Sequence, residues 1–395
     1  MATPVLKKHS RKPFFRIILY FLIAIPLLMW LAWYLTPKRK LVLAIVDKTV
    51  LTREGQEHIS LNWVLDQQRF AKTNNELYDR VEDYYGFFPQ DDEKYELKGL
   101  ERFDSSKLAE LSKDADAAYL TDTYGIFKNE WYRRGDAKDR SGIVYGGMSP
   151  QDLRFLQYLK GRHKLVITEF NCLGSPTDTM VSSGFEKMFA MKWSGWIGRY
   201  FDSFDTATNK ELPHWLIANY KKQHGGRWPF TKNGIVFVHS DDRIVVLENK
   251  THLISALPHI FATPAAREQY GIAEKIKYSF WFDIIIPDQR VNKVLASYYI
   301  DANRAGQAEL QRNGIPASFP AVLRHWGDDY KFFYFAGDFC DNPVELASAH
   351  FKKVAWLKWF MYNTSDPQER KSFFWEMYRP MVTTILEDYY ATLRR

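Results

Sequence analysis

Short apolar runs and segments with helical spacing alternate along residues 41–170. The apolar runs at 41–46, 115–124 and 164–170 have the length of strands and predict buried ones. Residues 61–70 carry apolar side chains at helical spacing. A second helix is expected after Ser149-Pro150, because serine is a favoured N-cap and proline a favoured first helical residue. This alternation predicts a layered α/β fold with a mostly parallel sheet flanked by helices.

The second half of the chain adds β-hairpins and C-terminal helices to that layered fold. Residues 234–239 and 243–248 are apolar runs on either side of Ser-Asp-Asp, a pattern typical of a hairpin. Further strands are expected at 280–287 and 331–336. Two helices are expected to close the chain, one at about 344–362 and one from Pro380 onward, which gathers its apolar side chains on one face.

The most apolar segment precedes all of these elements. Residues 17–35 carry no charge and lie between two groups of basic residues. A run of this length spans a bilayer as a helix, and Trp30, Trp33 and Tyr34 lie where aromatic rings favour the membrane interface. We therefore expect one retained transmembrane helix at 17–35. A cleaved signal peptide is the alternative, and the Leu-Thr-Pro-Lys sequence that follows makes a poor cleavage site.

The basic residues predict which way this helix is oriented. Five of them precede the apolar run and three follow it, so the tail at 1–16 is expected in the cytoplasm and the C-terminal domain outside it. The expected localisation is a single-pass protein of the cell envelope. The rest of the chain is expected to form an α/β domain at 41–345 and a helical extension at 346–395.

The positive net charge belongs to the N-terminal segment and not to the domain. The chain has 54 basic and 47 acidic residues, and the first forty residues contain eight basic and no acidic ones. The remaining 46 basic residues therefore nearly balance the acidic ones. A nucleic-acid-binding domain would carry a basic surface, so this composition gives no support for a nucleic-acid partner.

The two cysteines, Cys172 and Cys340, are too few for a disulfide framework. One disulfide between them would be compatible with a location outside the cytoplasm. We favour the other interpretation, which is two small buried thiols.

Three segments together resemble the class I glutamine amidotransferase-like fold, including its trehalose-utilisation-type and β-galactosidase trimerisation-type relatives. They are LVLAIVD, the pair ADAAYLTDTYG and GGMSPQDLRFLQYLK, and LVITEFNCLGSPT. The later stretch FPAVLRHWGDDYKFFYFAGDF is similar to the closing hairpin of those proteins. The resemblance covers about residues 41–345 and implies the fold.

The catalytic members of that family use a nucleophilic cysteine on a sharp turn, with a histidine and a glutamate downstream. Cys172 falls near the corresponding place. No His-x-Glu pair follows it, and Pro176 disfavours a helix starting there. The resemblance therefore implies a module without amidotransferase activity, with a thiol hydrolase at Cys172 as a third possibility.

Several predicted strands end in a carboxylate: Asp47, Asp122, Glu169 and Asp338, with Asp341 close behind. The C-terminal ends of parallel strands meet at one sheet edge, where ligands usually bind. Two carboxylates facing each other there could hydrolyse a glycosidic bond as general acid and base. The alternative is that each one caps the turn or helix that follows it.

Residues 193–205, WSGWIGRYFDSFD, are the candidate ligand-binding segment. Aromatic rings beside carboxylates and arginine are typical of saccharide sites, so Trp193, Trp196, Arg199, Tyr200 and Asp202 are expected to bind a ligand together with Asp338. The alternative is an ordered loop packed on the sheet. His58 and residues 83–86 are expected to line the same cleft.

The sequence contains no P-loop, no His-Glu-x-x-His, no Cys-x-x-Cys and no Gly-x-Ser-x-Gly motif, so we expect no nucleotide cofactor and no metal. Two hypotheses follow. The chain is either a non-catalytic membrane-anchored envelope protein that binds a glycan or a protein partner, or a membrane-tethered hydrolase of envelope saccharides that uses Glu169, Asp122 and Asp47.

Overall fold

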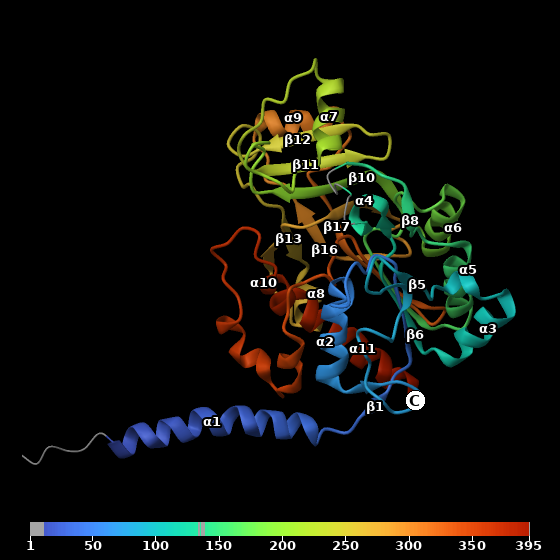
Figure 1. The fold of residues 1–395 in the computed structure, drawn as a ribbon, viewed down its shortest axis with the longest axis vertical. Helices are drawn as coiled ribbons and strands as arrows, with labels where there is room; N and C mark the ends of the chain where they lie inside the picture. Colours follow the sequence, from blue (N-terminus) through green and yellow to red (C-terminus); the bar gives the residue numbers. More distant parts are fainter. Residues whose placement is uncertain (1–11, 133–134, 136–138, 395) are drawn as a thin grey trace, which may run out of the picture.

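The computed structural model describes residues 12–132, 135 and 139–394, without the side chains of residues 12–19 and 23. The larger part of the expected cytoplasmic tail at 1–16 therefore lies outside the described residues. Figure 1 shows a layered body with a single helix, α1 (Lys12–Tyr34), extending away from it. Within the described side chains, no helix reaches the length and apolarity that crossing a membrane requires.

A ten-stranded mixed sheet forms the centre of the body. Its strand order is β14-β13-β16-β17-β18-β9-β6-β2-β4-β5. The run from β18 through β9, β6 and β2 to β4 is parallel, and every other pairing in the sheet is antiparallel. The prediction of a mostly parallel sheet is thus corrected to a mixed sheet with a parallel core. The antiparallel strands come from the second half of the chain, except β5, which pairs antiparallel with β4.

The strands of this sheet have the following bounds: β2 Leu43–Asp47, β4 Tyr85–Pro89, β5 Tyr95–Leu97, β6 Ala117–Asp122, β9 Leu165–Glu169, β13 His259–Ala262, β14 Lys275–Lys277, β16 Lys293–Tyr299, β17 Ser318–Trp326 and β18 Lys331–Phe335. The strands predicted at 41–46, 115–124, 164–170 and 331–336 are therefore present. β2, β6 and β9 are buried along their whole length, as their continuous apolar runs require.

A second, four-stranded antiparallel sheet has the order β12-β11-β10-β15. Its strands are β10 Met191–Phe201, β11 Gly234–His239, β12 Ile244–Glu248 and β15 Phe282–Pro287. The hairpin predicted around Ser-Asp-Asp is the β11–β12 pair. The candidate segment at 193–205 is largely strand β10 and not a loop, since it pairs with β11 on one side and β15 on the other.

Helices cover both faces of the central sheet, as Figure 1 shows. On one face pack α3 (Ser105–Asp114), α5 (Pro150–Gly161) and α6 (Thr179–Phe189); on the other lie α2 (Ile59–Gln68), α8 (Pro264–Tyr270) and α11 (Arg379–Leu393). The predicted cap of α5 is present, because the Ser149 hydroxyl accepts a hydrogen bond from the Asp152 amide at 3.0 Å.

The smaller elements complete the chain. They are β1 Arg39–Lys40, β3 Phe70–Ala71, β7 Ile126–Phe127, β8 Ile143–Tyr145, α4 Lys128–Trp131, α7 His214–Gln223, α9 Arg304–Arg312, α10 Lys371–Phe373 and the short helices η1 Gln56–His58, η2 Leu100–Arg102, η3 Leu346–His350, η4 Val354–Phe360 and η5 Phe374–Tyr378. The helix expected at 344–362 is wrong: the two 3-10 segments η3 and η4 occupy this range.

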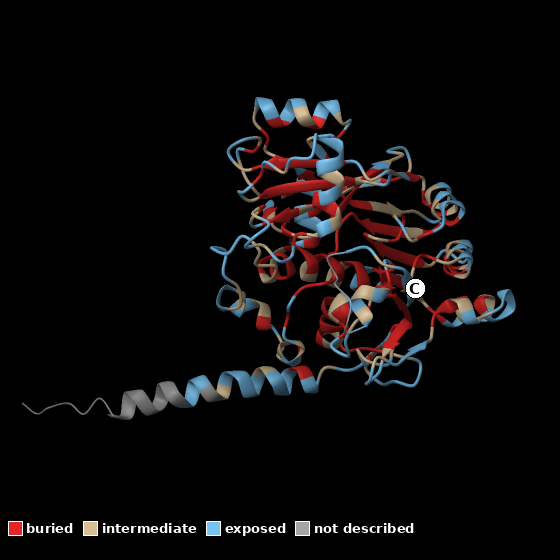
Figure 2. Cartoon of the chain, turned by 45° about the horizontal axis from the view of Figure 1, so that its top comes forward, coloured by how far each residue is buried: buried red, intermediate tan, exposed pale blue. Residues whose placement is uncertain are grey.

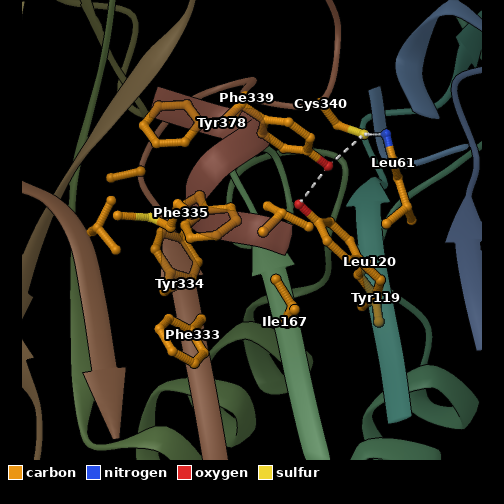
Figure 3. Packing of buried hydrophobic residues seen from close by; sticks show 14 of the residues in the cluster. Leu61, Tyr119, Leu120, Ile167, Phe333, Tyr334, Phe335, Phe339, Cys340 and Tyr378 are labelled. Carbon is orange, nitrogen blue, oxygen red and sulfur yellow. Dashed lines mark hydrogen bonds between the residues drawn. The ribbon is translucent and has the colours of Figure 1, made fainter. Parts of the chain in front are cut away.

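The core lies between the sheet and its helices, where Figure 2 shows buried residues along the central strands. It is rich in aromatic rings. In Figure 3, Phe333, Tyr334 and Phe335 of β18 lie beside Ile167 of β9 and Tyr119 of β6. Close packing of this kind fixes the direction of the parallel strands, and with it the position of the groups at their C-terminal ends.

Candidate functional site

The C-terminal ends of the parallel strands bring the predicted carboxylates to one edge of the sheet. Asp47, Asp122 and Glu169 are the last residues of β2, β6 and β9, and Asp338 follows β18. Asp47 and Asp122 are register partners on adjacent strands. Glu57 and Asp341 join this group, which we call the carboxyl rim: Asp47, Glu57, Asp122, Asp338 and Asp341.

Asp47 is tied to its own turn and to a histidine. One of its oxygens accepts a hydrogen bond from the Thr49 amide at 3.0 Å, and the other lies 2.5 Å from His58 Nδ1. The second nitrogen of His58 lies 2.8 Å from the Arg80 carbonyl oxygen, to which it donates. Both imidazole nitrogens thus face oxygen atoms, and these two contacts hold the ring in place at the end of β2.

Asp122 is held in a similar way. Its Oδ1 accepts a hydrogen bond from the Tyr124 amide at 2.6 Å, and Asn171 donates to its Oδ2 at 3.4 Å. Burial, followed by the negative charge of Asp47, raises the pKa of Asp122 to about 7. A carboxyl with this pKa exchanges its proton near neutral pH.

The outer part of the rim balances carboxylates against one arginine. Arg370 lies 3.1 Å from the Asp341 carboxylate and also donates to the Asp341 carbonyl oxygen at 2.7 Å. Gln56 donates to the same carboxylate at 2.6 Å. Glu57 Oε2 is buried without a hydrogen-bond partner, and burial together with Asp47 raises the Glu57 pKa well above its ordinary value. Burial also raises the pKa of Asp338.

Glu169 is fully buried, and hydrogen bonds occupy both of its carboxylate oxygens. Its two oxygens accept hydrogen bonds from the Tyr119 hydroxyl and from the main-chain amides of Phe339 and Cys340 at 2.5, 2.8 and 2.9 Å. Figure 3 shows Tyr119 continuing through Tyr378 to the Cys340 sulfur. Glu169 therefore fastens the loop after β18 onto β9, which is a structural role.

Cys172 is fully buried. Burial, and after it the charge of Asp122, raises the pKa of the Cys172 thiol well above its ordinary value. A nucleophilic thiol needs the opposite, a neighbouring base or positive charge that lowers the pKa. Neither cysteine forms a disulfide, which confirms the interpretation of two buried thiols.

The predicted ligand residues of β10 mostly support the second sheet. Trp196 and Tyr200 are buried, and the half-buried Trp193 donates its indole N–H to the Trp196 carbonyl oxygen. Asp202 is exposed just beyond the strand. Arg199 pairs with Glu211 at 2.6 Å.

Arg199 is the member of this segment that is linked to the carboxyl rim. Its guanidinium lies 5.1 Å from the ring centroid of Phe280, and the guanidinium of Arg370 lies 4.0 Å from the same centroid. Phe280 thus lies between Arg199 and Arg370, and Arg370 in turn pairs with Asp341 of the rim.

An open pocket of about 270 Å³ lies beyond the end of β2, next to the His58 ring that its lining residue Tyr84 contacts. We call it the strand-end pocket. Its lining comes from the segment after β2 and from both sides of β4: Val50, Arg53, Gly55, Arg80, Val81, Glu82, Tyr84, Phe88, Pro89, Gln90, Glu96 and Lys98.

Two aromatic rings and several charges give the pocket its chemistry. The rings of Tyr84 and Phe88 stack at 4.1 Å, and Tyr84 also contacts the His58 ring at 4.9 Å. Lys98 lies over Phe88 and 3.3 Å from Glu96. The pocket therefore combines an aromatic wall with hydrogen-bond donors and acceptors and adjoins the Asp47–His58 pair.

Sequence reasoning found part of this site. It placed Asp47, Asp122 and Asp338 at one edge and expected His58 and residues 83–86 near them. It missed Glu57, Arg80 and Lys98, whose sequence context contains no motif. Among the residues that the structure describes, no group of three or more His, Cys, Asp or Glu side chains is arranged to hold a metal ion.

The sequence matches no known protein-family profile, and it matches no curated protein. Solved structures with similarity include a β-galactosidase from Bacillus circulans sp. alkalophilus, with 10% identity, a TM-score of 0.34 and coverage of 76% of this chain and 30% of that one. A ThuA-like protein from Bacteroides uniformis has 11% identity and a TM-score of 0.33, covering 76% of this chain and 84% of that one.

A cytoplasmic protein from Salmonella typhimurium LT2 has 13% identity and a TM-score of 0.35, with coverage of 88% and 98%. The chain spans about a third of the length of the β-galactosidase. A β-galactosidase and a ThuA-like protein, types of relative that the sequence resemblance names, are among these structures, and all three TM-scores lie below 0.5.

Proposed function

We propose that this chain is a membrane-anchored protein whose amidotransferase-like α/β domain binds a saccharide in the strand-end pocket without hydrolysing it. The observation that carries the proposal is the pocket itself, at the C-terminal edge of parallel strands where ligands of such sheets bind. Its volume of about 270 Å³ suits a small ligand such as a sugar ring. Tyr84, Phe88 and the charged groups around them are the residue types that recognise sugars.

The arrangement of the carboxylates supports binding over catalysis. A glycosidase needs two carboxyl groups facing each other across an open cleft, at about 5–9.5 Å. Asp47 and Asp122 are buried and each accepts a hydrogen bond from a main-chain amide two residues further on. Glu169 is enclosed by Tyr119 and two main-chain amides. These contacts are those of turn caps and structural links.

The proposed anchor is the segment 17–35, with the N-terminus in the cytoplasm and the domain outside. Support comes from the uncharged run and its basic flanks. Further support comes from the exposed apolar side chains that α1 presents away from the body, Phe21, Leu22, Leu27 and Leu28 among them.

The test is a titration of the full chain, in detergent micelles, with oligosaccharides of N-acetylglucosamine, glucose, galactose and mannose, followed by thermal unfolding. One class is expected to raise the unfolding temperature, and Arg80→Met is expected to abolish that rise. Arg304→Met, an exposed arginine on α9, is the matched control and should bind as the parent does. If no class stabilises the chain, or if Arg80→Met binds unchanged, the proposal is wrong.

One observation favours the second candidate, a hydrolase of envelope saccharides. Burial and the charge of Asp47 raise the pKa of Asp122 to about 7, which suits a general acid that works near neutral pH. This candidate predicts release of reducing ends from the saccharide that binds, and loss of that release in Asp122→Asn. Binding without release excludes it.

A further inference from the structure

Four large apolar side chains project from one short segment of the surface. Trp356 and Trp359 are each 70% exposed, Phe360 is 87% exposed, and Leu357 is also exposed. We call these four residues the aromatic ridge. Single exposed apolar residues are ordinary, but a contiguous group of this size marks a surface that contacts something other than water.

The type of helix explains why Trp356 and Trp359 project from the same face. The ridge lies on the 3-10 helix η4, which has three residues per turn, so side chains three positions apart project from the same face. The Trp359 indole donates to the Trp356 carbonyl oxygen at 3.1 Å, which keeps both rings on the outer side. By the same spacing, Val354, Leu357 and Phe360 share another face, which is buried at Val354, where it packs on the body, and exposed at Phe360, where the segment ends.

The ridge begins directly beside the proposed anchor. The Lys352 amide donates to the Met29 carbonyl oxygen of α1 at 3.0 Å, and the Trp33 ring lies 4.4 Å from the ring of His350. Met29 precedes Trp33 by four residues, which is about 6 Å along a helix. The segment after Lys352 therefore starts one turn further along α1 than Trp33, toward the part of the helix assigned to lipid.

Basic side chains surround this contact. Lys353 lies over the Trp356 ring at 4.4 Å, and Arg69 lies over the Trp33 ring at 4.6 Å. Burial and the neighbouring charge of Arg39 lower the pKa of Lys352, so Arg39 and Lys352 both belong to this basic cluster. Glu387 pairs with Arg39 at 3.3 Å, and Glu376 pairs with Lys358 at 2.8 Å. Within the part of the chain that the structure describes, Lys352, Lys353 and Arg69 form no salt bridge, so three cations near the ridge lack a paired carboxylate.

We propose that the aromatic ridge enters the headgroup region of the lipid bilayer beside α1 and holds the domain against the membrane surface. This inference rests on the proposed anchoring and adds a second contact to it. Tryptophan and phenylalanine flanked by lysines are the residues that enter the interface, where the rings meet acyl chains and the ammonium groups meet anionic headgroups.

Lipid fits this surface better than a protein partner does. In Figure 1 the orange-red segment that carries the ridge lies on the side of the body where α1 extends. Any bilayer around α1 would therefore reach the ridge first, and a partner protein would have to displace lipid to cover it. A fixed domain would also hold the strand-end pocket at a set distance from the membrane.

The test uses the full chain in vesicles of phosphatidylcholine and phosphatidylglycerol. Because Cys172 and Cys340 are buried, one introduced cysteine can be labelled selectively with an environment-sensitive fluorophore. Three variants are compared: Phe360→Cys on the ridge, Leu28→Cys on α1 and Met180→Cys, which is 82% exposed on α6. Lipids spin-labelled near the headgroup test position 360, and lipids spin-labelled in the middle of the acyl chain test position 28, because each label quenches fluorophores at its own depth.

We expect quenching at positions 28 and 360 that is about threefold or more above that at 180. Quenching at 28 but not at 360 overturns the ridge proposal and leaves the anchor in place. Absence of quenching at 28 overturns the anchor and the ridge proposal together. A label at 360 that is shielded from aqueous iodide yet not quenched by spin-labelled lipid would show that protein covers the ridge, which also contradicts the proposal.

Discussion

Lys48 and Asp152 form an ion pair in which neither side chain is exposed, with the ammonium nitrogen 2.5 Å from the carboxylate. Lys48 directly follows Asp47 at the end of β2, and Asp152 lies in the first turn of α5. The same ammonium contacts Glu101 and donates to the Gly147 carbonyl oxygen at 3.0 Å. One cation thus joins the edge of the sheet to the helix layer beside the carboxyl rim.

Removing this cation is expected to destabilise the fold strongly. Lys48→Met would leave the buried Asp152 without its positive partner, and breaking such a pair from one side costs about 3–5 kcal/mol. Chemical denaturation of the full chain measures the effect. Lys107→Met, on the exposed Lys107–Glu110 pair of α3, is the control and should change the free energy of unfolding by less than about 1 kcal/mol. Equal effects would contradict this role for Lys48.

The raised pKa of Asp122 predicts a pH dependence with a definite sign. The pKa rises from 3.8 to about 7 on folding, so between these values the folded state binds the proton more tightly than the unfolded chain does. The resulting stabilisation is complete below pH 4 and is lost as pH rises through 7. The loss amounts to about 4 kcal/mol.

Asp122→Asn cannot lose that proton. The stability of this variant relative to the parent is therefore expected to increase from pH 4 to pH 8, measured by denaturation at each pH. Asp388→Asn, at an exposed position on α11, should keep a constant difference from the parent over the same range. A constant difference for Asp122→Asn as well would rule out the proton on Asp122.

Both thiols are expected to resist alkylation while the chain is folded. Cys172 and Cys340 are buried, and burial raises the pKa of each, so the reactive thiolate is scarce. Mass spectrometry after iodoacetamide treatment should find two unmodified cysteines in the native chain and two modified ones after denaturation. Rapid native alkylation of Cys172 would instead revive the thiol hydrolase hypothesis.

The proposed orientation predicts which side of the membrane the domain occupies. Met180→Cys introduces an exposed thiol on α6 of a chain whose own thiols are buried. A membrane-impermeant maleimide added to intact cells or spheroplasts should label this variant. Labelling that requires lysis would place the domain in the cytoplasm.

Sequence patterns predicted the parallel strands of the central sheet well, because the residues that specify each of these strands are neighbours in the sequence. The continuous apolar runs at 41–46 and 164–170, and the Ser149 cap, each determine an element without long-range information. The aromatic segment at 193–205 left two interpretations open, a saccharide site and an ordered loop, for the opposite reason. Whether Trp196 and Tyr200 face a ligand or the core is decided by pairing with β11 and β15, which lie far away in sequence.

The site was predictable only in part for the same physical reason. The apolar runs show where β2 and β6 end, so the sequence places Asp47 and Asp122 correctly at one edge of the sheet. The walls of the strand-end pocket come from irregular segments whose position depends on tertiary packing, so Arg80 and Lys98 gave no signal. The predicted helix at 344–362 failed because 3-10 geometry has a period of three, which an α-helical pattern does not reveal.

The central claim is that the strand-end pocket holds a saccharide, and the most direct measurement is a crystal structure of the chain with the saccharide class that stabilises it. The account predicts density for a sugar ring against Tyr84, within hydrogen-bond reach of Arg80 and Lys98, with the glycosidic bonds intact. Density for the sugar at any other place, with the pocket empty, would contradict it.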